Sequence, residues 1–146
     1  GHDAVRALRP RLPERAAWFS SPEPKALATA RLLSGDVTVV DALVEHRRAA
    51  TRWVADREEW RDQVRRAFSD PDRPAVPGWE PMTATRDRLL PAVRRILDEH
   101  DGDVVLVGHG TAWTLLRAEL TGGAPDLDAW QALALPDVWA LTRHAT

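Results

Sequence analysis

The sequence predicts an α/β fold, a three-layer α/β/α sandwich in which helices cover both faces of a mostly parallel sheet. Short apolar runs rich in β-branched residues, such as residues 37–40 (VTVV) and 103–107 (DVVLV), mark the strands. Longer segments with apolar residues at helical spacing alternate with these runs. Strands that alternate with helices pair in parallel, because each helix carries the chain back to the start of the next strand.

The helices are predicted by apolar residues that recur on one face. A helix over residues 3–12 has this spacing, although Pro10 weakens its end. Residues 47–68 are highly charged, but their tryptophans and aliphatic residues are spaced so as to bury one side. Residues 83–100 carry the same pattern in a longer aliphatic stripe.

Capping and turn residues set the boundaries of these elements. Ser21 and Pro22 open a helix, because serine can cap it and proline suits its first turn. Gly35 ends that helix, and residues 69–78 form a loop of prolines and aspartates. The expected elements are, in chain order, a helix over residues 3–12, a strand over 16–20, a helix over 24–34, a strand over 37–40, a helix over 47–68, a helix over 83–100, a strand over 103–107, a helix over 111–121, a short helix over 126–132 and a strand over 138–141.

Length and composition predict a single domain over residues 1–146. Hydrophobic residues make up 44% and charged residues 29%, an ordinary balance for a soluble protein. The formal net charge of −2 gives no general attraction to nucleic acid or to an anionic membrane. No apolar run approaches the ~20 residues of a membrane span, and the first residues lack the layout of a signal peptide. The chain has no cysteine, which fits the reducing cytoplasm. From these observations together we expect a cytoplasmic protein without membrane or nucleic-acid partners.

Residues 103–110 (DVVLVGHG) place a histidine where α/β proteins bind ligands. The buried strand runs into Gly108, and His109 follows directly before the expected helix. Ligands of open parallel sheets bind beyond the carboxyl ends of the strands, and the amides of a helix start favour an anion. An exposed histidine in an ordinary strand-to-helix turn would fit the same residues.

A second basic residue follows the first strand. Lys25 lies in the first turn of the helix expected over residues 24–34, and Ser21 lies in the turn before it. A cation at a helix N-terminus opposes the helix dipole, so it is unfavourable unless an anion is bound nearby. Lys25 is therefore a candidate phosphate ligand, with Ser21 beside it. The alternative is a solvated surface lysine.

Two further places carry residues suited to phosphate chemistry. Glu80 precedes the helix expected over residues 83–100, where it is either a general acid or base in a cleft or an ordinary cap. Arg143 and His144 follow the last expected strand. They suit a phosphate ligand and a nucleophile, but they equally fit a polar chain tail.

In combination these segments resemble the histidine phosphatase superfamily, the family of cofactor-dependent phosphoglycerate mutases and related acid-type phosphatases. The similarity rests on the order of residues 20–30 (SSPEPKALATA), Leu43 and Glu45, residues 78–80 (GWE) and residues 103–110. It covers nearly the whole chain, and the Ser-Ser-Pro and Gly-His-Gly motifs are fairly specific in this order. The resemblance implies a phosphoglycerate mutase-like fold.

The resemblance also implies a chemistry. Family members attack phosphorus with a histidine from an amino-terminal Arg-His-Gly motif, form a phosphohistidine intermediate and require no metal. We expect this chain to use no cofactor. At the matching positions His109 would contact the phosphoryl group as the second histidine, Lys25 would bind phosphate and Glu80 would protonate the leaving oxygen. Clustered cations and a proton donor are what phosphoryl transfer requires.

The motif that would supply the nucleophile is missing from its expected place. Residues 1–8 (GHDAVRAL) resemble the helix that follows this motif, so His2 lies within a helix rather than at a strand end. Two explanations stay open. The domain is truncated or degenerate, or it is circularly permuted so that residues 138–145 supply the missing strand, with Arg143 as phosphate ligand and His144 as nucleophile.

Residues 46–52 (HRRAATR) also depart from the family, which often has a glycine and a Trp-Glu-Gly segment here. This basic cluster either recruits an anionic substrate or forms the solvated face of a helix, and the second is the commoner outcome. The seven tryptophans fit buried helix faces or the interface of a homodimer.

The leading functional interpretation is a phosphomonoesterase-type histidine phosphatase domain that takes a small phosphorylated substrate or inorganic phosphate. Such a domain is inactive if its nucleophile is lacking. The alternative is a catalytically dead phosphate- or partner-binding module on the same fold. A nucleotide-binding regulator is a weaker third possibility, because the sequence has neither Gly-x-Gly-x-x-G nor a Gly-Lys-Ser/Thr loop.

Overall fold

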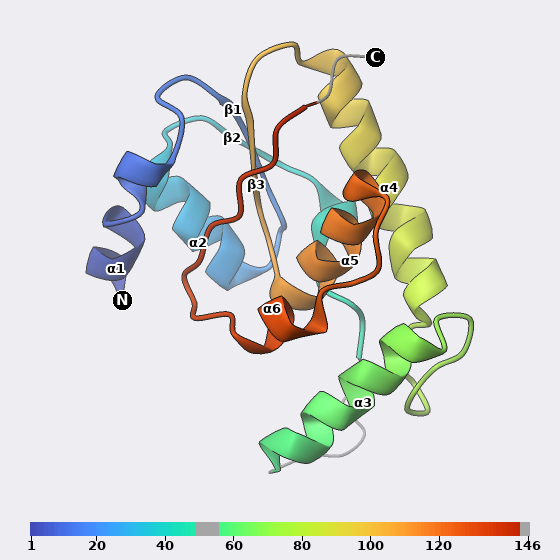
Figure 1. The fold of residues 1–146 in the computed structure, drawn as a ribbon. Helices are drawn as coiled ribbons and strands as arrows, with labels where there is room; N and C mark the ends of the chain where they lie inside the picture. The colour runs from blue at the N-terminus through green and yellow to red at the C-terminus, as the bar shows by residue number, and fades with distance from the viewer. Residues whose placement is uncertain (49–55, 144–146) are drawn as a thin grey trace.

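Three parallel strands form the centre of the computed structural model, which describes residues 1–48 and 56–143 (Figure 1). Strand β1 (Ala17–Ser20) lies in the middle, with β2 (Val37–Val39) on one side and β3 (Val104–Val107) on the other. In register, Phe19 lies opposite Thr38 and Leu106. Because all three strands run in the same direction, their carboxyl ends share one edge of the sheet.

Helices cover both faces of this sheet. Helix α2 (Pro24–Leu33) contacts all three strands on one face and α1 (His2–Arg6) packs against α2, while α4 (Met82–Glu99) and α5 (Gly110–Thr121) cover the other face (Figure 1). This arrangement is the predicted three-layer α/β/α sandwich. The remaining elements are, in chain order, the 3₁₀ turn η1 (Arg9–Arg11), the 3₁₀ turn η2 (Asp41–Leu43), α3 (Arg57–Ser69) and α6 (Leu127–Gln131).

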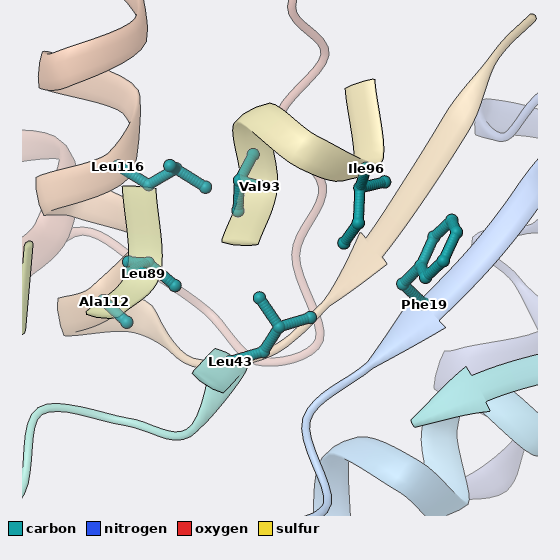
Figure 2. Packing of buried hydrophobic residues seen from close by; sticks show 7 residues of the cluster. All are labelled: Phe19, Leu43, Leu89, Val93, Ile96, Ala112 and Leu116. Atoms are coloured by element: carbon teal, nitrogen blue, oxygen red, sulfur yellow. The ribbon is translucent and has the colours of Figure 1, made fainter. Parts of the chain in front are cut away.

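One apolar cluster fixes α4 and α5 against the sheet. Burial of an aliphatic or aromatic side chain stabilises a fold by about 1.5–3 kcal/mol, so this cluster holds the start of α5 firmly beside the end of β3. Figure 2 shows Leu43 of η2 reaching in among side chains that come from β1, α4 and α5. The buried members are Phe19, Leu43, Leu89, Val93, Ile96, Ala112 and Leu116.

A second cluster attaches α3 to the rest of the domain. Val64 of α3 is buried with Trp79, which precedes α4, and with Trp130 of α6. Trp60 and Phe68 of α3 pack against these three, and the rings of Trp60 and Trp130 lie 5.5 Å apart between centroids. The apolar face of α3 is thus buried by Trp60, Val64 and Phe68, which have the predicted helical spacing.

Seven predicted elements occur within one residue of their expected bounds, but the helix expected over residues 3–12 is broken. Helix α1 ends at Arg6, and a 3₁₀ turn follows at Arg9–Arg11. An α-helix through this point is disfavoured, because the ring of Pro10 would clash with the carbonyl of Arg6 and Pro10 has no amide hydrogen to donate.

The helix expected over residues 47–68 is wrong at its start. Arg48 forms an isolated antiparallel bridge with Trp79 and is therefore not helical. Helix α3 begins at Arg57, where the carboxylate of Asp56 accepts the Glu58 amide as an N-cap. Residues 49–55, which include part of the basic cluster, lie outside the described residues.

The strand expected over residues 138–141 is also wrong, since this stretch is neither strand nor helix in the described part of the chain. The carbonyl of Val138 accepts a hydrogen bond from the Arg11 guanidinium at 3.1 Å. The ring of Trp139 lies against the guanidinium of Arg117. Side chains rather than a neighbouring strand therefore hold this segment.

None of the helices in the described ranges combines the length and the apolar character that a membrane span requires.

Gly108 should be the least replaceable glycine of the turn between β3 and α5. A Cβ built there would lie 2.4 Å from the Trp113 ring, whereas one at Gly102 would meet nothing within 4 Å. We expect Gly108→Ala to lower the free energy of unfolding by about 1–3 kcal/mol, the usual cost of overpacking. Denaturant titration of this variant beside Gly102→Ala measures the difference, and equal stability of the two variants would contradict the close approach.

Candidate functional site

The carboxyl edge of the sheet brings Ser21 and His109 together, as the sequence predicts. Ser21 directly follows β1 and His109 lies two residues beyond β3. The Ser21 amide donates to the carbonyl of Val107 at 2.9 Å, so the two strand ends are joined. Ser21 is fully buried, and His109 retains 17% of its side-chain exposure. The histidine thus has a fixed backbone and an accessible ring.

The Nε2 atom of His109 is the polar centre of this edge. It lies 2.8 Å from the hydroxyl oxygen of Ser21 and 2.8 Å from Oε2 of Glu23. Because a carboxylate only accepts hydrogen bonds, the contact with Glu23 indicates a proton on Nε2. His109 therefore presents a hydrogen-bond donor to whatever oxyanion lies at this point, and here that oxyanion is Glu23.

Ser21 and Lys25 have somewhat different places from those expected. The Ser21 oxygen accepts from the Glu23 amide at 3.1 Å, so it stabilises the turn before α2 rather than capping a helical amide. Lys25 is the second residue of α2 and is exposed. Among the described residues its ammonium group makes neither a hydrogen bond nor an ion pair, which leaves it available to a ligand.

The expected anion at the start of α5 is present, but it belongs to the protein. The two carboxylate oxygens of Glu45 accept from the amides of Thr111 at 3.0 Å and Ala112 at 2.7 Å. The Glu45 amide in turn donates to Oε2 of Glu23 at 2.8 Å. The sequence showed Glu45 only as part of a motif. The preference of free helix-start amides for an anion was the signal for its role.

Glu80 is held by a dense set of donors. Arg88 donates to both of its oxygens, at 2.9 and 3.1 Å, while the Thr85 hydroxyl and the Arg47 amide donate at 2.6 and 3.1 Å. Burial acts to raise the pKa of Glu80, but the hydrogen bonds from Arg88, Thr85 and Arg47 outweigh it and hold the pKa below its usual range. In this arrangement Glu80 is an ionised acceptor rather than a ready proton donor.

Arg88 is a central residue of the site that sequence reasoning missed. Besides Glu80, its guanidinium binds the carbonyls of Ala42, Val44 and Glu45 at 2.7–2.9 Å. It thereby joins the start of α4 to the segment that follows β2. Glu80 and Arg88 are eight residues apart in the sequence, which is not the spacing of neighbours on one helix, so the sequence alone does not show that they form an ion pair.

His46 is buried in the same wall of the site. Its Nε2 lies 2.6 Å from the carbonyl of Glu80, so Nε2 carries the proton, and its Nδ1 accepts from Nε of Arg48 at 3.3 Å. Burial lowers the pKa of His46, and the charge of Arg48 lowers it further, against the Glu80 carbonyl, which raises it. The ring is therefore neutral near pH 7.

A cleft of about 690 Å³ opens beside these residues. Glu23 lines it and also contacts His109, so this one side chain lies between the cleft and the edge of the sheet. Within residues 1–48 and 56–143 there is no cluster of three or more histidine and acidic side chains with the spacing of metal ligands. The cleft is lined by Glu23, Val44, Glu45, His46, Arg47, Arg48 and Gly78.

Arg143 does not join this site, which corrects the expectation that it binds phosphate there. Its guanidinium donates to the carbonyls of Leu97 at 2.9 Å and Gly102 at 2.8 Å. Both carbonyls lie just before β3, at the opposite edge of the sheet from His109. A carboxyl-terminal strand feeding Arg143 toward His109 is therefore not formed. His144 lies outside the described residues.

Removal of Arg88 should be strongly destabilising. Arg88→Met removes the charged partner of a carboxylate that is 11% exposed, together with the donor to three carbonyls, and we expect a loss of about 3–5 kcal/mol in the free energy of unfolding. Arg95→Met is the matched control, because Arg95 and Glu99 form an exposed pair that contributes roughly 0–1 kcal/mol. Urea titration of both variants tests this, and coincident curves would contradict the role of Arg88.

Acidification should destabilise the domain through His46. The unfolded chain takes up a proton near the ordinary value of about 6.5, whereas the folded chain resists it because the pKa of His46 is lowered. The free energy of unfolding should thus fall as the pH drops below about 6.5, by at most about 1.4 kcal/mol per pH unit. Urea titrations at pH 7.5 and 5.5 should show a smaller fall in His46→Gln, and an unchanged fall would exclude His46 as its source.

Comparisons with known proteins agree with this architecture. Residues 1–143 match the model of the histidine phosphatase superfamily, branch 1. YhfR of Bacillus stearothermophilus is 28% identical, with a TM-score of 0.60 over 91% of this chain and 69% of that one. A mycobacterial glucosyl-3-phosphoglycerate phosphatase in complex with inorganic phosphate is 26% identical, with a TM-score of 0.63 over 91% of this chain and 70% of that one.

A more distant likeness concerns the fold alone. A phosphoserine phosphatase mutant from Entamoeba histolytica, in complex with phosphoserine, is 16% identical, with a TM-score of 0.59 over 93% of this chain and 69% of that one. None of the curated proteins matches the chain by sequence. The family match extends over all the described residues, from Gly1 to Arg143. The chain therefore belongs to the histidine phosphatase superfamily, branch 1.

Proposed function

We propose that this phosphatase-type domain binds the phosphate group of a small phosphomonoester at the carboxyl edge of its sheet, beside His109. The observation that carries the proposal is the contact of His109 Nε2 with the Glu23 carboxylate at 2.8 Å. It identifies a donor already directed at an oxyanion. A structurally similar mycobacterial phosphatase is described with inorganic phosphate, which supports the same class of ligand here.

The proposed phosphate ligands are His109, Lys25 and the hydroxyl of Ser21. His109 and Ser21 are positioned by the joined ends of β1 and β3, while Lys25 supplies a positive charge from the first turn of α2. Charge-assisted hydrogen bonds to a dianion are the stronger kind. The Glu23 side chain is 43% exposed, so it can turn into solvent when a phosphate oxygen takes its place.

Hydrolysis through a phosphohistidine needs a second histidine with a ring nitrogen free to attack phosphorus. His46 uses both nitrogens in hydrogen bonds within the protein. His100 lies before β3, on the far side of the domain, and its Nδ1 donates to the carbonyl of Ile96 at 2.7 Å. His2 belongs to α1. We therefore expect the described residues to bind phosphate and to turn over phosphomonoesters poorly.

Glu80 as the proton donor is a finer part of the same proposal. It would have to loosen its contacts with Arg88, because a carboxylate held ionised has no proton to give to a leaving oxygen. The phosphomonoesterase interpretation therefore needs both a nucleophile beside His109 and a rearranged Glu80. Binding needs neither, and it is the function that the site supports best.

Titration with inorganic phosphate near pH 7.5, followed calorimetrically, tests the proposal. His109→Ala and Lys25→Ala should each weaken binding about tenfold, the effect expected on losing one charge-assisted contact. His2→Ala and Arg31→Ala are matched controls, because they remove a histidine and a cation from exposed positions away from the site, and they should leave the affinity unchanged.

Two results would contradict the proposal. The first is absence of phosphate binding by the wild-type chain at millimolar concentration. The second is an equal loss in the control variants. Rapid hydrolysis of p-nitrophenyl phosphate that His144→Ala abolishes would instead contradict the expectation of poor turnover, and would favour a nucleophile from the carboxyl terminus.

A further inference from the structure

The carboxylate of Glu23 lies at the carboxyl edge of the sheet and has no part in capping α2. Glu23 is the residue before this helix, but its side chain accepts no amide of the helix. The main chain holds the turn instead, since the Glu23 amide donates to the hydroxyl of Ser21 at 3.1 Å. The Glu23 side chain can therefore be replaced without loss of a helix cap or of this turn.

Two donors from separate parts of the chain converge on one oxygen of Glu23. Its Oε2 lies 2.8 Å from Nε2 of His109 and accepts a hydrogen bond from the Glu45 amide at 2.8 Å. His109 precedes α5 and Glu45 follows η2, so two distant segments supply the donors. A ring N–H and a main-chain N–H that point at one place form a binding position for an oxyanion. We call it the oxyanion position.

Glu23 occupies the oxyanion position without being tightly held there. Its side chain is 43% exposed, and contacts of a partly exposed charged group are weak and reversible. Within residues 1–48 and 56–143 no lysine or arginine nitrogen lies within 4.0 Å of its carboxylate, so Lys25 does not pair with it although it is only two residues away. An anion from solution can therefore compete with Glu23 for the same two donors.

A phosphate group can make more contacts at this edge than the carboxylate does. One phosphate oxygen can accept from both His109 and the Glu45 amide, as Oε2 of Glu23 does now. The other oxygens remain for Ser21 and Lys25, the ligands assigned above. Phosphate at pH 7.5 also carries more negative charge than a carboxylate. Displacement of Glu23 is therefore favourable, but the contacts of Glu23 must be broken first.

We propose that Glu23 is an internal competitor, whose carboxylate fills the oxyanion position so that a phosphate group binds only by displacing it. The inference rests on the proposed function, because the competitor and the ligand share the donor on His109. A site that is open for only a fraction of the time binds its ligand more weakly by that fraction. Glu23 thereby sets the phosphate concentration at which the site fills, and the Glu45 amide becomes a further phosphate ligand when Glu23 leaves.

Three substitutions of Glu23 separate competition from simple charge repulsion. Glu23→Ala removes both contact and charge, and should tighten the binding of inorganic phosphate about threefold to tenfold, the worth of one hydrogen-bonded contact. Glu23→Asp keeps the charge, but its side chain is one methylene shorter and does not reach both donors, so it should tighten binding by a similar factor. Glu23→Gln keeps a neutral acceptor of the same length, so its affinity should lie between those of wild type and Glu23→Ala.

Calorimetric titration near pH 7.5 measures these affinities. Asp36→Asn is the matched control, because it removes an exposed carboxylate just before β2, at the opposite edge of the sheet, and it should leave the affinity unchanged. Unchanged affinity in Glu23→Ala would overturn the inference. So would a Glu23→Asp variant that binds like wild type while Glu23→Gln binds more tightly, because that result indicates charge repulsion alone.

Exchange of the Glu45 amide with solvent gives a second readout, which NMR can follow. In the free wild-type chain Glu23 protects this amide. In free Glu23→Ala it should exchange faster, by about the same factor as the affinity rises, since one opening governs both. Saturating phosphate should slow its exchange again. Equal exchange in the two free proteins, or no slowing by bound phosphate, would contradict the shared position.

The failure of the inference and that of the proposed function are distinguishable. If neither wild type nor Glu23→Ala binds phosphate, the proposed function is overturned and the inference with it. If both bind with equal affinity, the inference alone is overturned. If only Glu23→Ala binds at millimolar phosphate, Glu23 is confirmed as a competitor, and phosphate binding by the wild-type chain is contradicted.

Discussion

The carboxylate of Glu45 on the first amides of α5 is the contact on which the site depends. Those amides have no acceptor inside the helix, and their partial positive charge favours an anion. By supplying it, Glu45 fixes its own main chain, whose amide donates to Glu23 and whose carbonyl accepts from Arg88. Glu23 in turn reaches His109. One helix end thus orders the wall of the cleft and, through it, the polar edge of the sheet.

The three carboxylates of the site are compensated in three different ways. Glu45 is neutralised by backbone amides, Glu23 by the donor on His109, and Glu80 by Arg88. None of them is paired with Lys25 or Arg48 within 4.0 Å in the described part of the chain. Each of these carboxylates is therefore paired within the protein, and the positively charged side chains that face the cleft remain available to bind a ligand.

The sequence predicted the layers of the fold and placed Ser21 and His109 each directly beyond a strand. Their contact follows because parallel strands share one edge. It could not show the contacts of Glu45 and Arg88, which join residues more than forty positions apart through hydrogen bonds to the main chain. Such contacts leave no periodic pattern. Glu80 is a different case: the sequence located the residue, but the partners that hold its pKa below the usual range, Arg88, Thr85 and the Arg47 amide, come together only in the fold.

The errors at the two ends of the chain have local causes. An apolar run over residues 138–141 resembled a strand, yet a strand also needs a neighbour with free hydrogen-bonding groups, and side chains hold this segment instead. The helix expected over residues 3–12 is broken because the ring of Pro10 would clash with the carbonyl four residues earlier. In both cases the structure of a segment depends on a group outside the pattern that predicted it: a neighbouring strand for residues 138–141 and an earlier carbonyl for residues 3–12.

The order of the strands gives the two halves of the site unequal local stability. β1 is hydrogen-bonded along both sides, so its amides should exchange with solvent only when the domain opens as a whole. β2 pairs on one side over three residues, and its last residue, Val39, is 40% exposed. Ser21 follows β1 and Arg48 lies beyond β2. We therefore expect the main chain beside Ser21 to exchange more slowly with solvent than the main chain beside Arg48.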